Sequence, residues 1–142
     1  MIKESLVYIS RSCVPPQDAE TEVNRIVAIA ETRNPAFGIT GALLFTGEYF
    51  AQVIEGDRVS IDGLIKAITD DPRHDQIMIV ARGPIAERRF PDWSMAYFGP
   101  SQFVSRHVTR LLNDPPLAEQ RRAAQWLSDL LAEFARSPRT AT

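Results

Sequence analysis

Apolar and polar residues alternate in some stretches of the chain and recur at helical spacing in others, which predicts a domain that mixes strands and helices. Alternating stretches rich in β-branched and aromatic residues predict strands over 5–11, 39–45, 49–55, 75–85 and 93–98. Apolar residues three and four positions apart predict helices over 19–33, 58–69, 101–112 and 116–136.

Local signals indicate where several of these elements begin and end. Thr46-Gly47-Glu48 is expected to join the second and third strands into a hairpin. Asp18 is predicted to cap the first helix. That helix is expected to end before Asn34, because Asn34 precedes Pro35 and proline pushes the preceding residue out of the α region. Residues 137–142 are predicted to form a frayed tail.

The order of the elements predicts the α+β class and a ferredoxin-like, five-stranded mixed sheet. Right-handed crossovers place the first two helices on the same face of this sheet. The other face would then be bare, so the two C-terminal helices are predicted to cover it. We therefore expect one main domain over residues 1–100 and a C-terminal helical cap over residues 101–142.

Composition and charge restrict the classes of protein to consider. Apolar residues make up 44% and charged residues 24% of the 142 residues, which is typical of a soluble globular protein. No apolar run approaches the roughly 20 residues that span a bilayer, and the N-terminus lacks a secretion signal. We therefore expect a cytoplasmic protein without membrane contact. A net charge of -2 gives no electrostatic reason to expect nucleic acid as a partner.

Cysteine and histidine offer little chemistry in this chain. Cys13 is the only cysteine, so no internal disulfide can form. His74 and His107 belong to no cluster with metal-ligand spacing, so no metal is expected. A catalytic Cys/His pair stays open in principle, but no local motif supports it, and a buried or loop thiol is the simpler interpretation of Cys13.

The candidate chemistry centres on Gln52. Strand alternation places Gln52 between two apolar residues of the same face, Phe50 and Ile54. If that face is covered, an unpaired amide would cost about 1–3 kcal/mol, so Gln52 needs both a donor and an acceptor. These partners could be a neighbouring side chain or a helix-end carbonyl, or they could be a bound ligand with mixed hydrogen-bonding edges.

Two further polar residues are expected near Gln52. Tyr8 in the first strand should face the same helical layer, and Asn34 lies where the first helix is predicted to end. An apolar slot with a few placed polar groups suits a flat heteroaromatic ligand. The slot should be lined by the apolar faces of the first two helices, with Ile26 and Ile29 on the first and Leu64, Ile65 and Ile68 on the second.

Several segments carry a resemblance to a known family: LVYISR at 6–11, RNPAFGITGALLF at 33–45, EYFAQVIEG at 48–56, DPRH at 71–74 and RRFPDWSM at 88–95. In this order they resemble the BLUF family, the blue-light sensors that hold the flavin of FAD. The resemblance covers 6–95 and implies that FAD is the cofactor and that its flavin lies between the first two helices.

The resemblance also implies roles for single residues. Gln52 matches the glutamine that contacts the flavin near N5 and O4, and Tyr8 matches the tyrosine that bonds this glutamine and donates an electron. Asn34 matches the asparagine on the carbonyl edge of the ring. Trp93 and Met95 match a pair on the last strand, of which one or the other packs near the glutamine.

Weaker matches complete the implied cofactor site. Ile26 and Ile65 resemble residues that flank the slot. The residues that resemble the region near the ribityl and phosphate chain are Asp71, Arg73 and His74. Arg33 stands beside Asn34 where the family varies, and it is included as a cofactor-binding candidate.

The implied function is that of a blue-light photoreceptor. Rearranged hydrogen bonds of Gln52 would signal through the strand of Trp93 and Met95 to the C-terminal helices. From there the signal would pass to a protein partner in trans or to a homo-oligomer, and no output enzyme is expected within the chain. The alternatives are a small flavin-dependent oxidoreductase, which would need a substrate cavity and acid/base groups, and a non-flavin, ligand-binding regulatory module of ferredoxin-like fold.

Overall fold

The computed structural model describes residues 2–99, 101–113, 115–136 and 139–140. Its strands are β1 (Lys3–Ser12), β2 (Thr40–Phe45), β3 (Tyr49–Asp57), β4 (His74–Ile85), β5 (Trp93–Phe98) and the short β6 (Arg139–Thr140). Its helices are α1 (Ala19–Ala36), α2 (Arg58–Thr69), α3 (Gln102–Leu112) and α4 (Leu117–Arg136), with a 3-10 turn, η1 (Pro16–Asp18), before α1.

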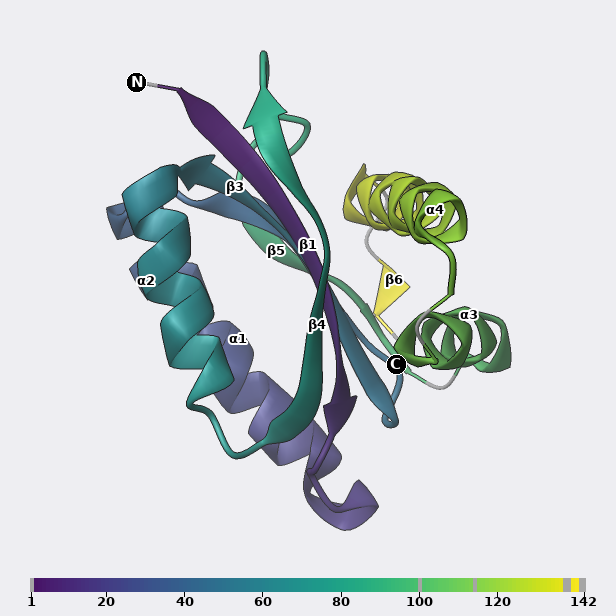
Figure 1. The fold of residues 1–142 in the computed structure, drawn as a ribbon. Helices are drawn as coiled ribbons and strands as arrows, with labels where there is room; N and C mark the ends of the chain where they lie inside the picture. Colours follow the sequence, from purple (N-terminus) through teal and green to yellow (C-terminus); the bar gives the residue numbers. More distant parts are fainter. Residues whose placement is uncertain (1, 100, 114, 137–138, 141–142) are drawn as a thin grey trace.

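One mixed sheet separates two pairs of helices. The strand order is β4-β1-β3-β2-β5-β6. The pairs β4-β1, β1-β3 and β3-β2 are antiparallel, and the pairs β2-β5 and β5-β6 are parallel. Figure 1 shows α1 and α2 on one face of the sheet and α3 and α4 on the other. The predicted α+β, ferredoxin-like arrangement is therefore confirmed, with β6 as a short additional strand.

The two faces of the sheet belong to two separate hydrophobic cores, because alternate strand residues point to opposite faces. Tyr8 pairs with Gln52 and Val7 with Val53, so β1 and β3 present matched residues to each face. Leu6 and Tyr8 of β1 pack against the apolar sides of α1 and α2. On the other face, Val7, Ile9, Leu44 and Val53 of the strands pack against Val108 of α3 and Leu127 and Leu131 of α4. Both faces are thus covered, as the sequence predicts.

The end of α1 differs from the prediction. The helix does not stop before Asn34 but continues through Pro35 to Ala36. Gly38 has a φ of +68°, and its N–H bonds the Pro35 carbonyl while the N–H of Ile39 bonds the Asn34 carbonyl. This pair of bonds is a Schellman motif, in which a left-handed glycine terminates the helix. Gly38, rather than Pro35, therefore sets the boundary, and Asn34 belongs to the last helical turn.

Two smaller expectations also need correction. Asp18 occupies the N-cap position of α1, but its side chain makes no capping hydrogen bond, because η1 already leads into the helix and the backbone of Asp18 is itself helical. The tail was expected to fray, but Arg139–Thr140 form β6 beside β5; residues 137–138 and 141–142 lie outside the described residues.

Candidate functional site

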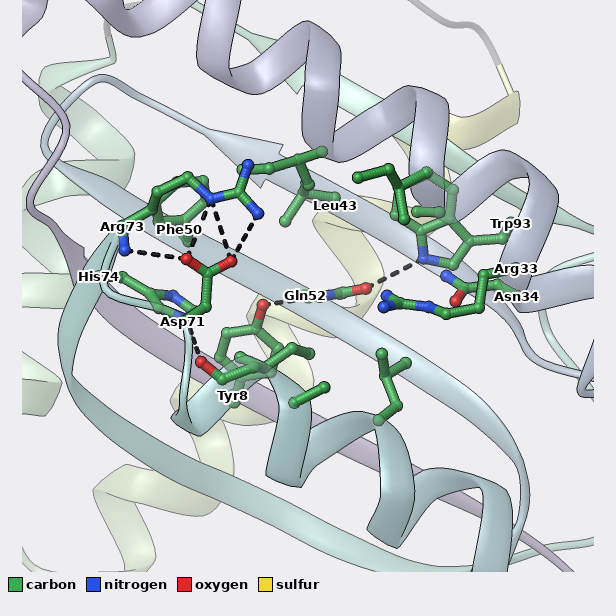
Figure 2. A pocket seen from close by; sticks show the side chains of 16 residues that line it. Tyr8, Arg33, Asn34, Leu43, Phe50, Gln52, Asp71, Arg73, His74 and Trp93 are labelled. Carbon is green, nitrogen blue, oxygen red and sulfur yellow. Dashed lines mark hydrogen bonds and ion pairs between the residues drawn. The ribbon is translucent and has the colours of Figure 1, made fainter.

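A pocket opens between the sheet and the two helices α1 and α2. It contains about 680 Å³ of space, its open mouth included. Figure 2 shows that side chains from β1, α1, β3, β4 and β5 converge on it. Most of the predicted site residues line it, namely Tyr8, Ile26, Arg33, Asn34, Gln52, Asp71, Arg73, His74 and Trp93.

The amide of Gln52 lies between two aromatic side chains (Figure 2). Its Nε2 donates a hydrogen bond of 2.7 Å to the Tyr8 hydroxyl oxygen, and its Oε1 accepts one of 3.0 Å from the Trp93 indole N–H. Gln52 is 5% exposed, Tyr8 2% and Trp93 5%. Three residues from β1, β3 and β5 thus form a buried chain of hydrogen bonds.

Trp93 fixes the orientation of this amide. An indole N–H can only donate, so the amide atom that faces Trp93 must be the oxygen. The Tyr8 hydroxyl can both donate and accept, so it would tolerate either end of the amide. Rotating the Gln52 amide by half a turn would therefore keep a partner at Tyr8 but set two donors against each other at Trp93.

Tyr8 is held in its neutral form by its surroundings. Burial raises the pKa of the Tyr8 phenol well above its ordinary value, because removal from water disfavours the phenolate. The hydrogen bond from Gln52 acts in the opposite direction, and the negative charge of Asp71 adds to the rise in pKa. At neutral pH Tyr8 therefore keeps its proton.

Asn34 and Arg33 present unpaired polar atoms to the pocket. Among the described residues, the buried side-chain polar atoms without a hydrogen-bond partner are Asn34 Oδ1 and Arg33 Nε. Asn34 is 1% exposed, so water does not replace the missing partner easily. One atom is an acceptor and the other a donor, which fits a ligand that carries both an N–H and a carbonyl, as the flavin ring does.

The other end of the pocket holds a charged cluster. The Arg73 guanidinium binds the Asp71 carboxylate through both Nε and Nη2, at 3.0 and 2.7 Å, and lies 3.6 Å from Glu22. Burial acts to raise the pKa of Asp71, but the hydrogen bonds and charge of Arg73 outweigh it, so this pKa lies below its ordinary value. Both side chains are therefore charged at neutral pH.

His74 joins this cluster to the sheet. Its Nε2 lies 2.7 Å from the Ile68 carbonyl, which can only accept, so Nε2 carries a proton. Its Nδ1 lies 2.8 Å from the Ser10 hydroxyl, and its ring meets the edges of Tyr8 and Phe50. These contacts fix the ring at the rim of the pocket.

Two of the predicted site residues do not line the pocket. Ile65 and Met95 pack against the same hydrophobic core but do not line the pocket. Leu43, Phe50, Ala30 and Ala67 line it although the sequence did not single them out. Alternation signalled two of them, since Leu43 and Phe50 lie on the same strand face as Gln52.

The described residues also bear on metal sites and membrane-spanning helices. No group of three or more His, Cys, Asp or Glu side chains in the described part of the chain could hold a metal ion. No helix in that part is both long and apolar enough to cross a membrane. The cytoplasmic location and the lack of a nucleic-acid partner stay predictions.

Known proteins share this sequence pattern. Residues 4–96 match the family model described as BLUF, sensors of blue-light using FAD. The chain is 34% identical over 90 residues to the photoactivated adenylate cyclase subunit beta of Euglena gracilis, which is 63% of this chain and 10% of the relative. It is 33% identical over 94 residues to the blue light- and temperature-regulated antirepressor BluF of Escherichia coli (strain K12), which is 66% of this chain and 23% of the relative. The chain thus spans less than a quarter of the length of these relatives.

A solved structure of similar length also matches. BlrB, a BLUF protein in its dark state, shares 34% sequence identity with the chain at a TM-score of 0.70. The match covers 93% of this chain and 96% of BlrB. The family match ends at residue 96, and the division into 1–100 and 101–142 stays a prediction. The chain belongs to the BLUF family of flavin-binding blue-light sensors.

Proposed function

We propose that this chain is a blue-light photoreceptor in which the Gln52 amide is the light-operated element. The observation that carries the proposal is the buried chain from Tyr8 through Gln52 to Trp93 beside a pocket with an unpaired acceptor on Asn34. Neither the oxidoreductase nor the non-flavin regulatory module is favoured by any contact in this pocket. The family membership of the chain supports the sensor.

The flavin that we propose is FAD. The name of the family gives FAD, and the polar groups of the pocket suit the flavin ring. Asn34 Oδ1 would accept from the ring N–H, and Gln52 would meet the same ring. The cluster of Asp71, Arg73 and His74 would lie near the ribityl and phosphate chain. Arg33 lies beside Asn34 at the opposite end of the pocket, so its Nε would donate to the ring rather than to the phosphates.

A bound flavin supplies the absorption of blue light and accepts an electron. The chain supplies the remaining steps. Tyr8 is neutral and buried, so it could pass one electron and its phenolic proton together to the bound flavin, the proton by way of the Gln52 amide, without leaving a charge in an apolar site. Gln52 has a donor end and an acceptor end, and rotation or tautomerisation of its amide changes which partner each end serves.

The energy of this rearrangement is small. A hydrogen bond exchanged for another contributes on the order of 1 kcal/mol, comparable with allosteric couplings of about 1–3 kcal/mol. It can bias an element with two arrangements but cannot refold a domain. β5 is the natural element, because Trp93 begins it and bonds Gln52 directly. We propose that β5 passes the signal to the C-terminal helices and then to a protein partner or a second copy of the chain. No output enzyme within this chain is proposed.

The proposal is tested by purifying the chain with its cofactor. We expect a yellow protein that releases one flavin per chain on denaturation, and chromatography of the released flavin distinguishes FAD from FMN. Recovery of FMN would overturn the choice of FAD but not the light-sensing role. A colourless chain that takes up no added flavin would overturn the whole proposal.

A further inference from the structure

A buried glutamate on the opposite face of β3 from Gln52 has no role in the light reaction described above. Glu55 is 1% exposed and lies three residues after Gln52, on the face that otherwise carries Ala51 and Val53. A carboxylate taken out of water is destabilising unless hydrogen bonds satisfy it. The donors that bond the Glu55 carboxylate therefore identify the segments that this side chain holds in place.

The donors to Glu55 come from two segments. The Thr40 hydroxyl donates to Oε1 at 2.9 Å. The backbone N–H groups of Arg89 and Phe90 donate to Oε2 at 2.8 Å and to Oε1 at 3.1 Å. The Arg88 guanidinium closes the arrangement with bonds to the Thr40 hydroxyl and the Glu55 carbonyl. Bonds to a charged acceptor are stronger than those between neutral groups, so Glu55 fixes the backbone at 89–90 firmly.

This backbone leads directly into the strand of Trp93. Residues 86–92 connect β4 to β5, and Trp93 is the first residue of β5. The N–H of Gly41 bonds the Asp92 carbonyl at 3.0 Å, which is a second attachment of the same segment. Gly41 has a φ of +146°, and a Cβ there would lie 1.9 Å from the Val53 carbonyl oxygen, so only glycine permits this approach. Both β2 and β3 thus set the position from which the Trp93 indole reaches Gln52.

The same segment is attached to the C-terminal helices. The Arg89 guanidinium donates to the Ser128 hydroxyl and to the Asp129 carboxylate of α4, both at 3.0 Å. Arg89 therefore bonds the buried Glu55 with its backbone and α4 with its side chain. A displacement of Trp93 would therefore act on a segment whose start, at Arg89, is held by both β3 and α4.

We propose that Glu55 is a positioning residue that holds residues 89–93 so that the Trp93 indole meets Gln52, and that Arg89 connects this segment to α4. The first half is a statement about the dark structure and stands without light. The second half rests on the proposed function, since it describes how a light-driven change at Gln52 would reach α4.

The first half is tested by replacing Glu55→Gln, which keeps the size of the side chain and turns one acceptor into a donor. Trp93 and Trp126 are the only tryptophans, so the indole N–H region of an NMR spectrum of ¹⁵N-labelled protein holds two signals, and Trp93→Phe assigns them. We expect Glu55→Gln to move the Trp93 signal and to speed its exchange with solvent about tenfold or more, with the Trp126 signal as an internal reference.

The matched control is Glu48→Gln, an exposed glutamate in the hairpin turn, which should leave both indole signals in place. If Glu55→Gln is folded and leaves the Trp93 signal and its exchange unchanged, the positioning role is wrong. If Glu55→Gln does not fold, Thr40→Val decides, because it removes one donor from the carboxylate. It should shift the Trp93 signal in the same direction by a smaller amount, and no shift would overturn the proposal.

The second half is tested by Arg89→Ala in the flavin-loaded protein, with Arg121→Ala, an exposed arginine of α4, as the control. Amide hydrogen exchange of α4 is compared in darkness and under blue light. We expect a light-dependent change in wild type and Arg121→Ala that falls by about half or more in Arg89→Ala, while the absorption change persists. An undiminished change in Arg89→Ala, or none in a wild-type protein whose absorption does respond, would overturn the connection. A wild-type protein without any absorption response would instead contradict the proposed function and leave the dark NMR test of Glu55 valid.

Discussion

Replacing Gln52→Leu removes the two central hydrogen bonds of the pocket at nearly constant side-chain size. Trp93 is 5% exposed, so its indole N–H would lose its acceptor without gaining water, at a cost of about 1–3 kcal/mol. The Tyr8 oxygen also loses its donor, but the leucine avoids burying an amide, and these two effects roughly offset each other. We therefore expect a loss of about 2 kcal/mol in the free energy of unfolding of the flavin-free protein.

The assay is urea unfolding of the flavin-free variant, followed by absorption spectra of the flavin-loaded variant before and after blue light. Gln17→Leu, an exposed glutamine in η1, is the matched control and should change the stability by less than about 0.5 kcal/mol. Gln52→Leu should still bind flavin, because Asn34 and the apolar walls remain, but it should lose the light-induced red shift. A red shift of wild-type size in Gln52→Leu would refute the role of the amide in the light response. An unchanged free energy of unfolding would refute the claim that the hydrogen bonds of Gln52 stabilise the fold.

Further predictions concern other parts of the structure. Asn34→Leu should raise the flavin Kd about 2- to 10-fold in equilibrium titration yet make the flavin-free protein more stable, since it removes an unpaired buried acceptor; tighter flavin binding would contradict this. Burial raises the pKa of Tyr8 above its ordinary 10.0, so the unfolded chain loses this proton first as the pH rises. The free energy of unfolding should therefore decline from about pH 10 upward. Tyr8→Phe should show a smaller decline in urea unfolding, and an equal decline would contradict the buried, neutral phenol. Leu127→Ala should cost about 2–5 kcal/mol in unfolding free energy, since Leu127 is 0% exposed in the core shared by α4 and the sheet; a cost below about 1 kcal/mol would show that α4 does not share that core.

The sequence predicts the central contact of the pocket well. Strand alternation alone places Tyr8 and Gln52 on one face, and the structure pairs them across adjacent strands. The apolar spacing in 19–33 and 58–69 predicts the two helices, and right-handed crossovers place both on one face of the sheet. Asn34 was expected in the right place for an incomplete reason, because the Schellman motif at Gly38 depends on a backbone conformation that the Asn-Pro pair does not indicate.

The choice between Trp93 and Met95 could not be made from the sequence. Across β2, Leu43 pairs with both Gln52 and Met95, so Met95 is level with Gln52, whereas Trp93 is level with Gly41. The long indole nevertheless spans this offset and bonds the amide, which only side-chain geometry reveals. Glu55 escaped prediction for a similar reason, since its donors lie in residues 89–90, whose path between β4 and β5 follows no periodic pattern.

The most direct test of the account is the visible absorption of the purified, flavin-loaded chain recorded in darkness, under blue light and again in darkness. The account predicts flavin bands that shift to longer wavelength under light and return in the dark, because the bound ring stays oxidised while the hydrogen bonds of Gln52 change. Flavin bands that stay in place under light, or that only bleach, would contradict the claim that a hydrogen-bond rearrangement at Gln52 is the response.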